Sequence, residues 1–387
     1  MKKNFTLLYD QFPLLPFHLV KQITPHINRL DLWNMTIVCF KNKDNKGLPD
    51  NIDGMKLIRM KNWMGIFSRV PIIKKLRQLS IFWYLLRNSK KIDILNVYHF
   101  QHKTVIDGLF YKFLNKNGFL YIDLDDDLVN IKKSGTFTGR DWSPMEKAFL
   151  GKADLFSQQT MEGVVLIKEK IPDLRDKVMY LPGGVDDFFL KNNFKKIKSF
   201  KEKENIILTA GRIGSEQKNS DLLLGLIEDI DLKDWKVVFA GPLEGDFSAK
   251  AGALIKRRPD LKSKILLTGY LKDRQDFYSW FDRSKVFCLT SKWESFGLVL
   301  AEAAYFGEFV ITTPVGCAYD LVTGGRYGLV IDRENVSMFK KALEDIISGK
   351  TDISSHYDGI IKNAGEKFLW SRIAWKLSVE ITKRIRF

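Results

Sequence analysis

The chain has 387 residues, 45% of them apolar, and a net charge of +16. This length suits two domains better than one, and the apolar content argues against a disordered chain. Its three cysteines, Cys39, Cys288 and Cys317, form no Cys-x-x-Cys pair, so we expect neither a disulfide framework nor a zinc site, and a cytoplasmic location fits. We also expect no signal peptide and no transmembrane segment, because no clean apolar run is long enough.

The first part of the chain, residues 1–190, is predicted to form an α/β domain. Short apolar runs predict strands at 5–9, 35–40, 56–60, 92–98, 119–124, 155–158 and 178–181. Segments with helical spacing, notably 70–88 and 103–117, separate several of these strands. The next segment, 191–204, is charged and has few large apolar residues, so we interpret it as a solvated linker.

The second part, residues 205–365, alternates more regularly. Strands are predicted at 205–210, 235–240, 264–268, 286–290, 309–313 and 328–331. Helices are predicted at 220–230, 247–258, 274–284, 295–306 and 336–348. Continuous apolar strands that alternate with helices indicate a parallel sheet covered on both faces, which is a Rossmann-like domain.

Two glutamates eight residues apart, Glu294 and Glu302, lie around the start of the helix that follows strand 286–290. Ser295 is a candidate N-cap, and Gly297 would let a ligand approach the first turn closely. In an open α/β sheet, ligands bind at the carboxyl ends of strands, phosphate prefers a helix N-terminus and carboxylates accept hydrogen bonds from hydroxyls. The alternative interpretation is a solvated helix start with two surface acids.

A second motif places Arg212 and Lys218 in a glycine-containing turn between strand 205–210 and the next helix. A diphosphate leaving group needs its growing negative charge neutralised, and both side chains can do this. We expect both to be exposed in a crevice. The alternative is an ordinary basic loop over a helix.

Together these segments resemble the donor-binding half of glycosyltransferase family 4, the retaining enzymes of the GT-B fold. The matching residues, in the family's order, are Gly211-Arg212, Lys218-Asn219, Ala240-Gly241-Pro242, Thr268-Gly269-Tyr270, the run from Thr290 to Leu298, Glu302-Ala303, Gly307 and Gly328. The likeness covers residues 205–345 well and extends weakly to 181–186, where Gly183 replaces an asparagine. Residues 366–387 look like the C-terminal helix that crosses back to the first domain. The resemblance implies two Rossmann-like domains whose parallel sheets face each other across a cleft.

The resemblance also implies a donor site for a nucleotide-sugar. In it, Glu294 binds hydroxyls of the transferred sugar, Glu302 binds the ribose, and two cations hold the diphosphate. The base lies near Tyr270 and Leu271, and no metal or other cofactor is needed. The full set of donor-binding residues is Arg212, Lys218, Tyr270, Leu271, Glu294, Ser295, Phe296, Gly297, Leu298 and Glu302.

The first domain departs from the family pattern, because the glycine-rich loop after its first strand is not visible. The family commonly has a histidine after the fourth or fifth strand, and here strand 119–124 leads into Asp125. We therefore expect Asp125 or His99, together with Glu294, to be catalytic, although His99 also fits a structural role. Asp123 and Asp125 also read as Asp-x-Asp, the metal-binding signature of the other large transferase fold.

Partners are predicted from charge and from the resemblance. Residues 1–100 hold 17 Lys and Arg against 6 Asp and Glu, and segment 69–91 mixes cations with large apolar residues. This segment fits either the anionic inner face of a membrane or a core-packing helix with basic flanks. No nucleic-acid partner is expected, because no binding module is recognisable.

The predicted function is the retaining transfer of a hexose-type sugar from a UDP- or GDP-sugar. The acceptor is a glycan, a lipid-linked glycan or a protein, in surface polysaccharide or glycoconjugate biosynthesis. The alternative is a catalytically silent relative that binds glycans or supports a partner enzyme.

Overall fold

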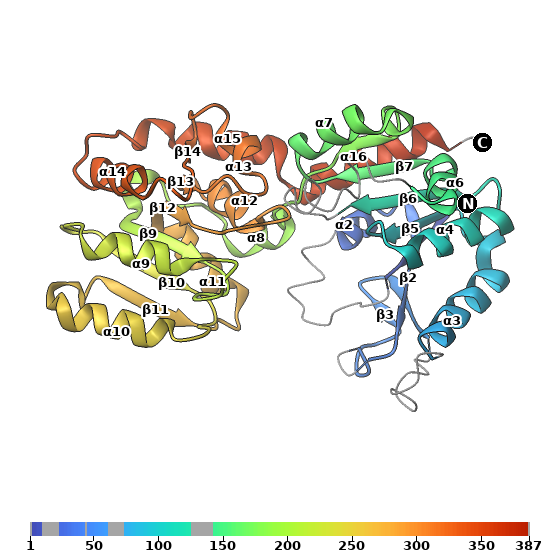
Figure 1. The fold of residues 1–387 in the computed structure, drawn as a ribbon, viewed down its shortest axis with the longest axis horizontal. Helices are drawn as coiled ribbons and strands as arrows, with labels where there is room; N and C mark the ends of the chain where they lie inside the picture. The colour runs from blue at the N-terminus through green and yellow to red at the C-terminus, as the bar shows by residue number, and fades with distance from the viewer. Residues whose placement is uncertain (1, 10–22, 43–44, 61–72, 125–141, 386–387) are drawn as a thin grey trace. The chain divides into compact units, whose positions relative to one another are not determined.

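The structure is a computed structural model that describes residues 2–9, 23–42, 45–60, 73–124 and 142–385. It divides into two compact units, unit 1 of Met1–Gly183 with Trp370–Phe387, and unit 2 of Gly184–Leu369. Each unit has a mostly parallel sheet with helices on both faces (Figure 1). The predicted α/β fold with two Rossmann-like domains is therefore confirmed.

The division between the units falls after Gly183, whereas the sequence indicated a linker at residues 191–204. Those residues belong to unit 2, where helix α8 (Asp187–Asn193) ends within them. Lys203 is buried, and its ammonium group donates to the carbonyl oxygens of Phe281 and Asp282 at 2.9 Å each. High charge predicted solvation, but long-range contacts that the sequence does not show bury part of the segment.

Unit 1 contains an eight-stranded sheet in the order β3-β4-β2-β1-β5-β6-β7-β8, parallel except for the pair β3–β4. Its strands are β1 (Lys3–Leu8), β2 (Trp33–Phe40), β3 (Asn51–Ile52), β4 (Met55–Met60), β5 (Ile94–Tyr98), β6 (Phe119–Leu124), β7 (Leu155–Gln158) and β8 (Val178–Tyr180). Its helices are α2 (Ile23–Arg29), α3 (Ile73–Asn88), α4 (His102–Leu114), α6 (Pro144–Lys152), α7 (Met161–Lys170) and α16 (Trp370–Arg384).

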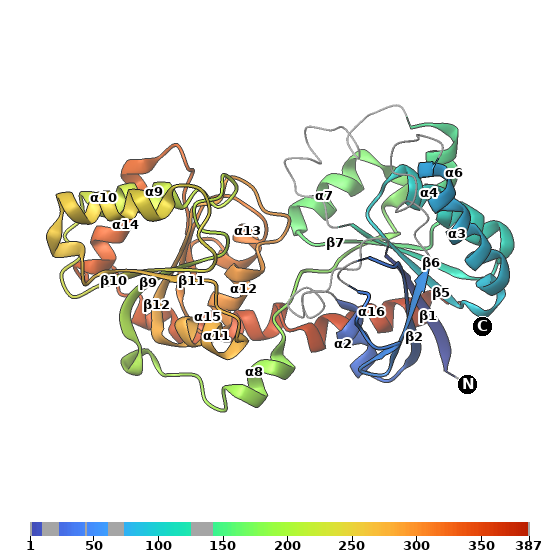
Figure 2. The ribbon, with the colours of Figure 1, turned by 90° about the horizontal axis from the view of Figure 1, so that it is seen from below.

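The C-terminal helix α16 belongs to unit 1, as the sequence predicted. It packs beside α2 under the sheet, while α3, α4 and α6 lie over the opposite face (Figure 2). The rings of His26 and Trp370 stack with their centroids 5.2 Å apart at this contact. Burial of Trp370, Ile373, Leu377 and Ile381 along one side of α16 explains why the helix docks there.

Unit 2 contains a six-stranded parallel sheet in the order β11-β10-β9-β12-β13-β14. Its strands are β9 (Glu204–Ala210), β10 (Lys236–Ala240), β11 (Ile265–Gly269), β12 (Ser284–Leu289), β13 (Phe309–Thr312) and β14 (Gly328–Val330). Besides α8, its helices are α9 (Ser220–Glu228), α10 (Phe247–Arg257), α11 (Arg274–Arg283), α12 (Leu298–Tyr305), α13 (Ala318–Val322), α14 (Val336–Ile347) and α15 (Tyr357–Lys367).

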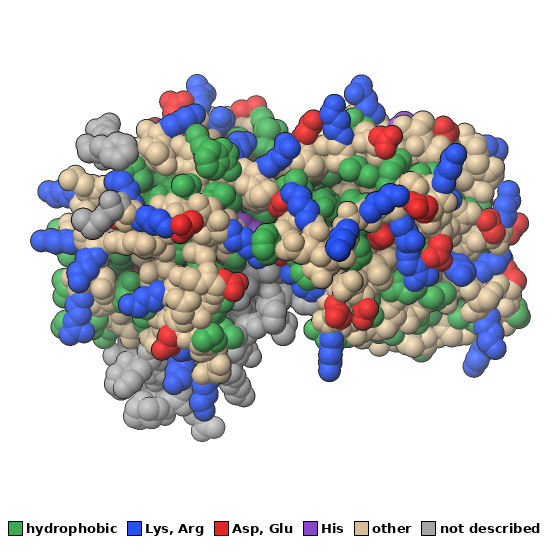
Figure 3. Space-filling view, turned by 180° about the vertical axis from the view of Figure 1, so that it is seen from behind, with side chains coloured by type: hydrophobic (Ala, Val, Ile, Leu, Met, Phe, Trp, Pro, Cys, Tyr) green, Lys and Arg blue, Asp and Glu red, His purple; other side chains and the backbone are tan. Residues whose placement is uncertain are grey.

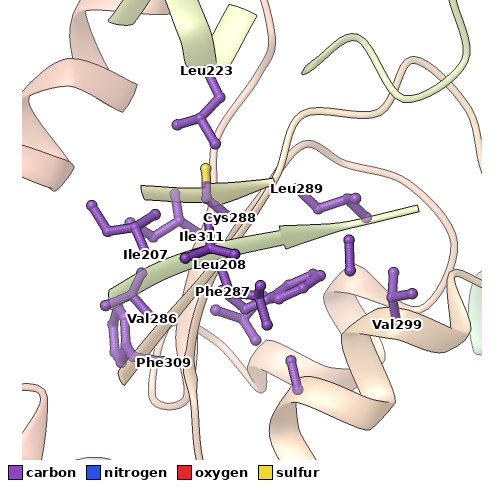
Figure 4. Packing of buried hydrophobic residues seen from close by; sticks show 14 of the residues in the cluster. Ile207, Leu208, Leu223, Val286, Phe287, Cys288, Leu289, Val299, Phe309 and Ile311 are labelled. Carbon is purple, nitrogen blue, oxygen red and sulfur yellow. The ribbon is translucent and has the colours of Figure 1, made fainter. Parts of the chain in front are cut away.

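The core of unit 2 forms on both faces of its sheet. In β12, Val286 to Leu289 are all buried, as expected for a central parallel strand. Leu223 of α9 lies over one face, toward Cys288, and Val299 of α12 lies on the other (Figure 4). All three cysteines of the chain are free and buried. No helix in the described ranges is long and apolar enough to cross a membrane.

A buried carboxyl group just before β13 gives a first prediction. Glu308 is fully buried, and neither of its carboxyl oxygens has a hydrogen-bond partner among the described residues. Burial raises the pKa of Glu308 well above its usual value, and burial also lowers the pKa of Lys203 to about 8. Because the folded state holds the Glu308 proton more tightly, the carboxyl favours folding at about pH 4.5 and below. That stability is lost as the pH rises through the raised pKa.

We expect Glu308→Gln to remove this loss. The free energy of unfolding of the variant, relative to wild type, should therefore increase by about 1 kcal/mol or more between pH 5 and pH 8. Urea unfolding at several pH values measures the effect, with the exposed Glu344→Gln as the matched control. Parallel stability–pH curves for wild type and Glu308→Gln would contradict the prediction.

Candidate functional site

The sheet of unit 2 reverses its strand order between β9 and β12, which are neighbours although their successors extend in opposite directions. The loops after these two strands, 211–219 and 290–297, therefore meet at one edge, where an open α/β sheet binds its ligand. They are tied together, because Thr290 Oγ1 donates to Asn219 O at 2.9 Å and Lys292 N donates to Gln217 O at 2.8 Å. The fold thus brings the two sequence motifs into one site.

Lys218 and Glu294 form an ion pair in this site. Lys218 Nζ lies 2.6 Å from Glu294 Oε1, and their side chains are 13% and 8% exposed. Ser291 Oγ also donates to Glu294 Oε1 at 2.6 Å, and Gln217 Nε2 donates to Glu294 Oε2 at 3.3 Å. The expectation that Lys218 is exposed was wrong, because the carboxylate of Glu294 draws it into the loop contact.

Arg212 is the more accessible cation of the site, with 55% of its side chain exposed. Its Nη2 donates to Gln217 Oε1 at 2.8 Å, and its Nη1 lies 3.7 Å from Glu244 Oε1. The preceding Gly211 has φ +141°, and a Cβ there would lie 2.8 Å from the Cε of Lys218. The positive φ favours glycine at 211, and a Cβ there would also press on the Lys218 side chain.

The turn into α12 differs from the prediction. The helix begins at Leu298, with Gly297 as its N-cap at φ +80°, so Ser295 is not the N-cap. Phe296 is buried, and its carbonyl oxygen accepts a hydrogen bond from Cys317 N at 2.8 Å. This anchor makes the chain turn at Gly297, which tolerates the left-handed conformation. The free N–H groups of the first turn of α12 still lie at the edge of the site.

Glu302 lies one to two turns further along α12 and is 4% exposed. Tyr278 Oη donates to Glu302 Oε1 at 2.7 Å, whereas Glu302 Oε2 has no hydrogen-bond partner among the described residues. Both glutamates of the motif are thus buried, and the alternative of two surface acids is wrong. A buried acceptor without a donor is costly, which makes Oε2 a place where a ligand hydroxyl would be favourable.

The two residues predicted to lie near the base follow β11 on the same edge of the sheet. Tyr270 is 58% exposed and comes directly after Gly269, and Leu271 is half-buried. Because β10 separates β11 from β9, the segment that follows β10 lies between these residues and the Arg212 loop, and its Gly241 bridges to Gly269. An exposed ring at this position can stack on a flat base.

Unit 1 has its own reversal of strand order, between β1 and β5. A cavity of about 140 Å³ lies there, lined by Tyr9, Tyr98, His99, Lys103 and others. His99 adopts φ +63°, a conformation that is uncommon for residues other than glycine. Burial, with a smaller contribution from the charge of Lys103, lowers the pKa of His99 below its usual value. His99 thus lies at the ligand edge of unit 1.

The other first-domain candidate, Asp125, lies outside the described residues. Its neighbour Asp123 is buried at the end of β6 and accepts a hydrogen bond from Ser157 Oγ at 2.9 Å. Burial raises the pKa of Asp123 to about 6. Within the described ranges, which exclude Asp125, no group of three His, Cys, Asp or Glu side chains is placed to hold a metal.

Sequence reasoning missed the three residues that donate to the glutamates besides Lys218, which are Gln217, Tyr278 and Ser291, and it missed Arg274, which donates to Asp186. Two of them could have been predicted from their position in the sequence, because Gln217 adjoins Lys218 and Ser291 precedes Glu294 by three residues. Arg274 and Tyr278 come from α11, and only the folded chain places Tyr278 against Glu302 and Arg274 against Asp186.

Comparison with known proteins agrees with this geometry. Residues 191–367 match the family model of glycosyl transferases group 1. The chain is 30% identical over 171 residues to a D-inositol 3-phosphate glycosyltransferase of Paenarthrobacter aurescens, covering 36% of this chain and 41% of that protein. It is 30% identical over 170 residues to the lipopolysaccharide core biosynthesis mannosyltransferase LpsB of Rhizobium meliloti, covering 42% and 46%. These matches span less than half the length of each relative.

Over nearly the whole chain, the fold is similar to that of Anabaena Alr3699/HepE in complex with UDP. The TM-score is 0.71 at 13% identity, with 98% of this chain and 100% of that chain covered. The same protein in complex with UDP-glucose gives a TM-score of 0.67 at 14% identity, covering 98% and 99%. At this identity the likeness shows the fold, which agrees with the two Rossmann-like domains of the GT-B fold predicted from the sequence.

Proposed function

We propose that this protein transfers a hexose-type sugar from a nucleotide-sugar donor to an acceptor, because residues 191–367 match the family model of glycosyl transferases group 1. The donor is a UDP- or GDP-sugar, and the reaction retains the configuration of the sugar. The acceptor is a glycan, a lipid-linked glycan or a protein. A role in surface polysaccharide or glycoconjugate biosynthesis agrees with the similarity to a mannosyltransferase of lipopolysaccharide core biosynthesis.

One observation carries this proposal: buried carboxylates and cations converge where unit 2 reverses its strand order. Arg212 and Lys218 supply positive charge for the diphosphate of the donor, and that charge also stabilises it as a leaving group. The N–H groups at Ser295–Leu298 add donors at a helix start. Because this site supplies its own positive charge, we propose that no metal and no other cofactor is required.

The two glutamates divide the remaining parts of the donor between them. Glu294 lies 2.6 Å from the ammonium group of Lys218, so a sugar attached to a phosphate on Lys218 would reach its carboxylate. Glu302 offers its unpartnered Oε2 to the ribose hydroxyls. The half-exposed ring of Tyr270, with Leu271, faces the base.

We assign the acceptor to unit 1, at the cavity beside His99. The lowered pKa of His99 keeps its imidazole neutral at pH 7, so the ring can accept a hydrogen bond or a proton from an acceptor hydroxyl. Asp125, which follows Leu124 at the end of β6, is the second candidate for this role.

The proposal predicts that UDP or GDP raises the melting temperature of the protein in the presence of EDTA. A nucleotide at 100 times its Kd should add about 2.7 kcal/mol to the free energy of unfolding. Thermal shift with UDP, GDP and their sugars measures this, together with hydrolysis or transfer of the sugar. Stabilisation that requires Mn²⁺ and disappears in Asp125→Ala would instead support the Asp-x-Asp alternative. Nucleotide binding without any turnover would indicate the catalytically silent relative.

We further propose that α3 contacts the anionic inner face of a membrane, where a lipid-linked acceptor would lie. Ile81 and Leu85 are buried against the core, whereas Leu79, Trp83 and Leu86 are 46–54% exposed at helical spacing. The exposed Arg87, Lys90 and Lys91 follow them. On the face that Figure 3 shows, Lys and Arg side chains are scattered rather than gathered in one patch. The part of segment 69–91 before Ile73 lies outside the described residues.

We expect the chain to cosediment with vesicles that contain an anionic lipid, and less so at high salt. Leu79→Ser combined with Trp83→Ser should lower this binding several-fold, because the exposed apolar face supplies part of it. The matched control is Phe113→Ser, which removes a side chain that is 75% exposed on α4 of the same unit. Equal binding of wild type and the double variant would rule out this surface.

A further inference from the structure

A series of mostly buried polar side chains extends from α8 to Glu302 of α12. Glu302 Oε1 accepts from Tyr278 Oη at 2.7 Å, and Tyr278 is 3% exposed. Burial, with a smaller contribution from the charge of Glu302, raises the pKa of Tyr278 well above its usual value. The phenol therefore keeps its proton and always donates to Glu302.

Arg274 lies against Tyr278. Its guanidinium carbon is 5.8 Å from the centre of the Tyr278 ring, and its Nη2 lies 3.1 Å from Asp186 Oδ2. The guanidinium carbon also lies 3.8 Å from the centre of the Phe189 ring. A planar group fixed by a carboxylate and an aromatic ring has little freedom to move.

Asp186 in turn is fixed by the backbone. It is buried and serves as the N-cap of α8, where its Oδ1 accepts from Phe189 N at 3.2 Å. The series Asp186–Arg274–Tyr278–Glu302 thus connects the start of α8 to the glutamate of α12. It leaves one oxygen, Glu302 Oε2, without a hydrogen-bond donor among the described residues.

We propose that Tyr278 and Arg274 are positioning residues that orient Glu302 so that Oε2 receives a ribose hydroxyl of the donor nucleotide. The inference rests on the proposed function and extends it. The Tyr278 hydroxyl keeps its proton, so it always occupies Glu302 Oε1 as a hydrogen-bond donor. This leaves Oε2 as the hydrogen-bond acceptor for the ligand, which makes the site selective for ribose over deoxyribose. A hydroxyl at Oε2 satisfies the remaining buried acceptor, and a deoxyribose cannot.

A purely structural role for Tyr278 makes a different prediction. Its ring packs among aromatic residues, with centroids 6.0 Å from those of Phe189 and Phe306. If only this packing mattered, Tyr278→Phe would keep the ring and leave nucleotide binding unchanged. If the hydroxyl orients Glu302, the same variant should reduce the preference of the site for a ribonucleotide over its dideoxy form.

The experiment measures the Kd of UDP or GDP, whichever stabilises wild type, and that of its 2′,3′-dideoxy form. In wild type we expect the dideoxy form to bind about 10- to 100-fold more weakly, as for the loss of a hydrogen bond to a charged group. In Tyr278→Phe this ratio should fall to within about threefold, mainly because the ribonucleotide binds less tightly. Arg274→Met should lower the ratio in the same direction.

The matched control is Tyr357→Phe, which removes a tyrosine hydroxyl of the same unit. That hydroxyl donates to Lys198 O at 2.5 Å and not to Glu302. The ratio in this variant should equal that of wild type. An unchanged ratio in Tyr278→Phe, with both affinities retained or lowered together, would overturn the inference while leaving the proposed function in place. Failure of wild type to bind either UDP or GDP would overturn the proposed function, and the inference with it.

Discussion

Lys218→Ala is expected to lower sugar transfer by about 100-fold or more, the typical loss when a charge-stabilising group is removed from an active site. The variant should also unfold more easily, because Glu294 would remain buried without its cationic partner. Removing one member of a buried ion pair typically costs about 3–5 kcal/mol. Turnover at saturating donor and urea unfolding measure the two effects separately.

Arg212→Ala provides the matched comparison, since it removes a cation from the same loop. The Arg212 side chain is half-exposed and lies 3.7 Å from its carboxylate partner, Glu244. The substitution should lower transfer but leave the free energy of unfolding within about 0.5 kcal/mol of wild type, as is usual for exposed positions. Full turnover in both variants would mean that the diphosphate is not held here.

Glu302→Ala and Glu294→Ala are expected to affect different ligands. Glu302→Ala should weaken the free nucleotide and the nucleotide-sugar alike, by about 10- to 100-fold, because both carry the ribose. Glu294→Ala should leave the free nucleotide bound at least as tightly, because the ammonium group of Lys218 no longer pairs with a carboxylate and can turn to the phosphates. Transfer should nevertheless fall, since the sugar loses its acceptor group.

Calorimetry with the free nucleotide, followed by turnover with the donor, distinguishes the two glutamates. Glu302→Gln serves as a control, because its amide oxygen can still accept from Tyr278 while the negative charge is gone. An equal loss of nucleotide affinity in both alanine variants would refute the division of roles but not the transferase assignment.

Much of the fold of unit 2 follows from local pattern alone. Its apolar strands are long enough to be central, and its helices begin and end within a few residues of where hydrophobic spacing places them, as for 220–230 against α9 and 247–258 against α10. The start of α12 does not follow from the sequence, because Ser295 is a good cap by type. Its position is decided by the buried Phe296 and by the contact of that residue with Cys317, which no local pattern shows.

The site was predictable to the extent that it consists of motifs. Arg212, Lys218, Glu294 and Glu302 are all placed at one sheet edge. Their pairing was not predictable: the contact between Lys218 and Glu294 joins residues 76 positions apart. The same holds for Tyr278, because α11 precedes β12 and only the sheet order brings it beside α12. Sequence spacing therefore predicted which charged groups lie at this end of the sheet, but not which of them pair with each other.

The crossing of α16 back to unit 1 has a consequence for how the chain folds as it is made. Unit 1 is interrupted by unit 2, so its α2 face lacks its covering helix until residues 370–384 have been synthesised. At about 5–20 residues per second, translation of unit 2 takes on the order of 10–40 s. Unit 2 is continuous in sequence and can complete its folding first. The α2 side of unit 1, including His26, is not covered until Trp370 has been synthesised. The order of completion is therefore the reverse of the order of synthesis.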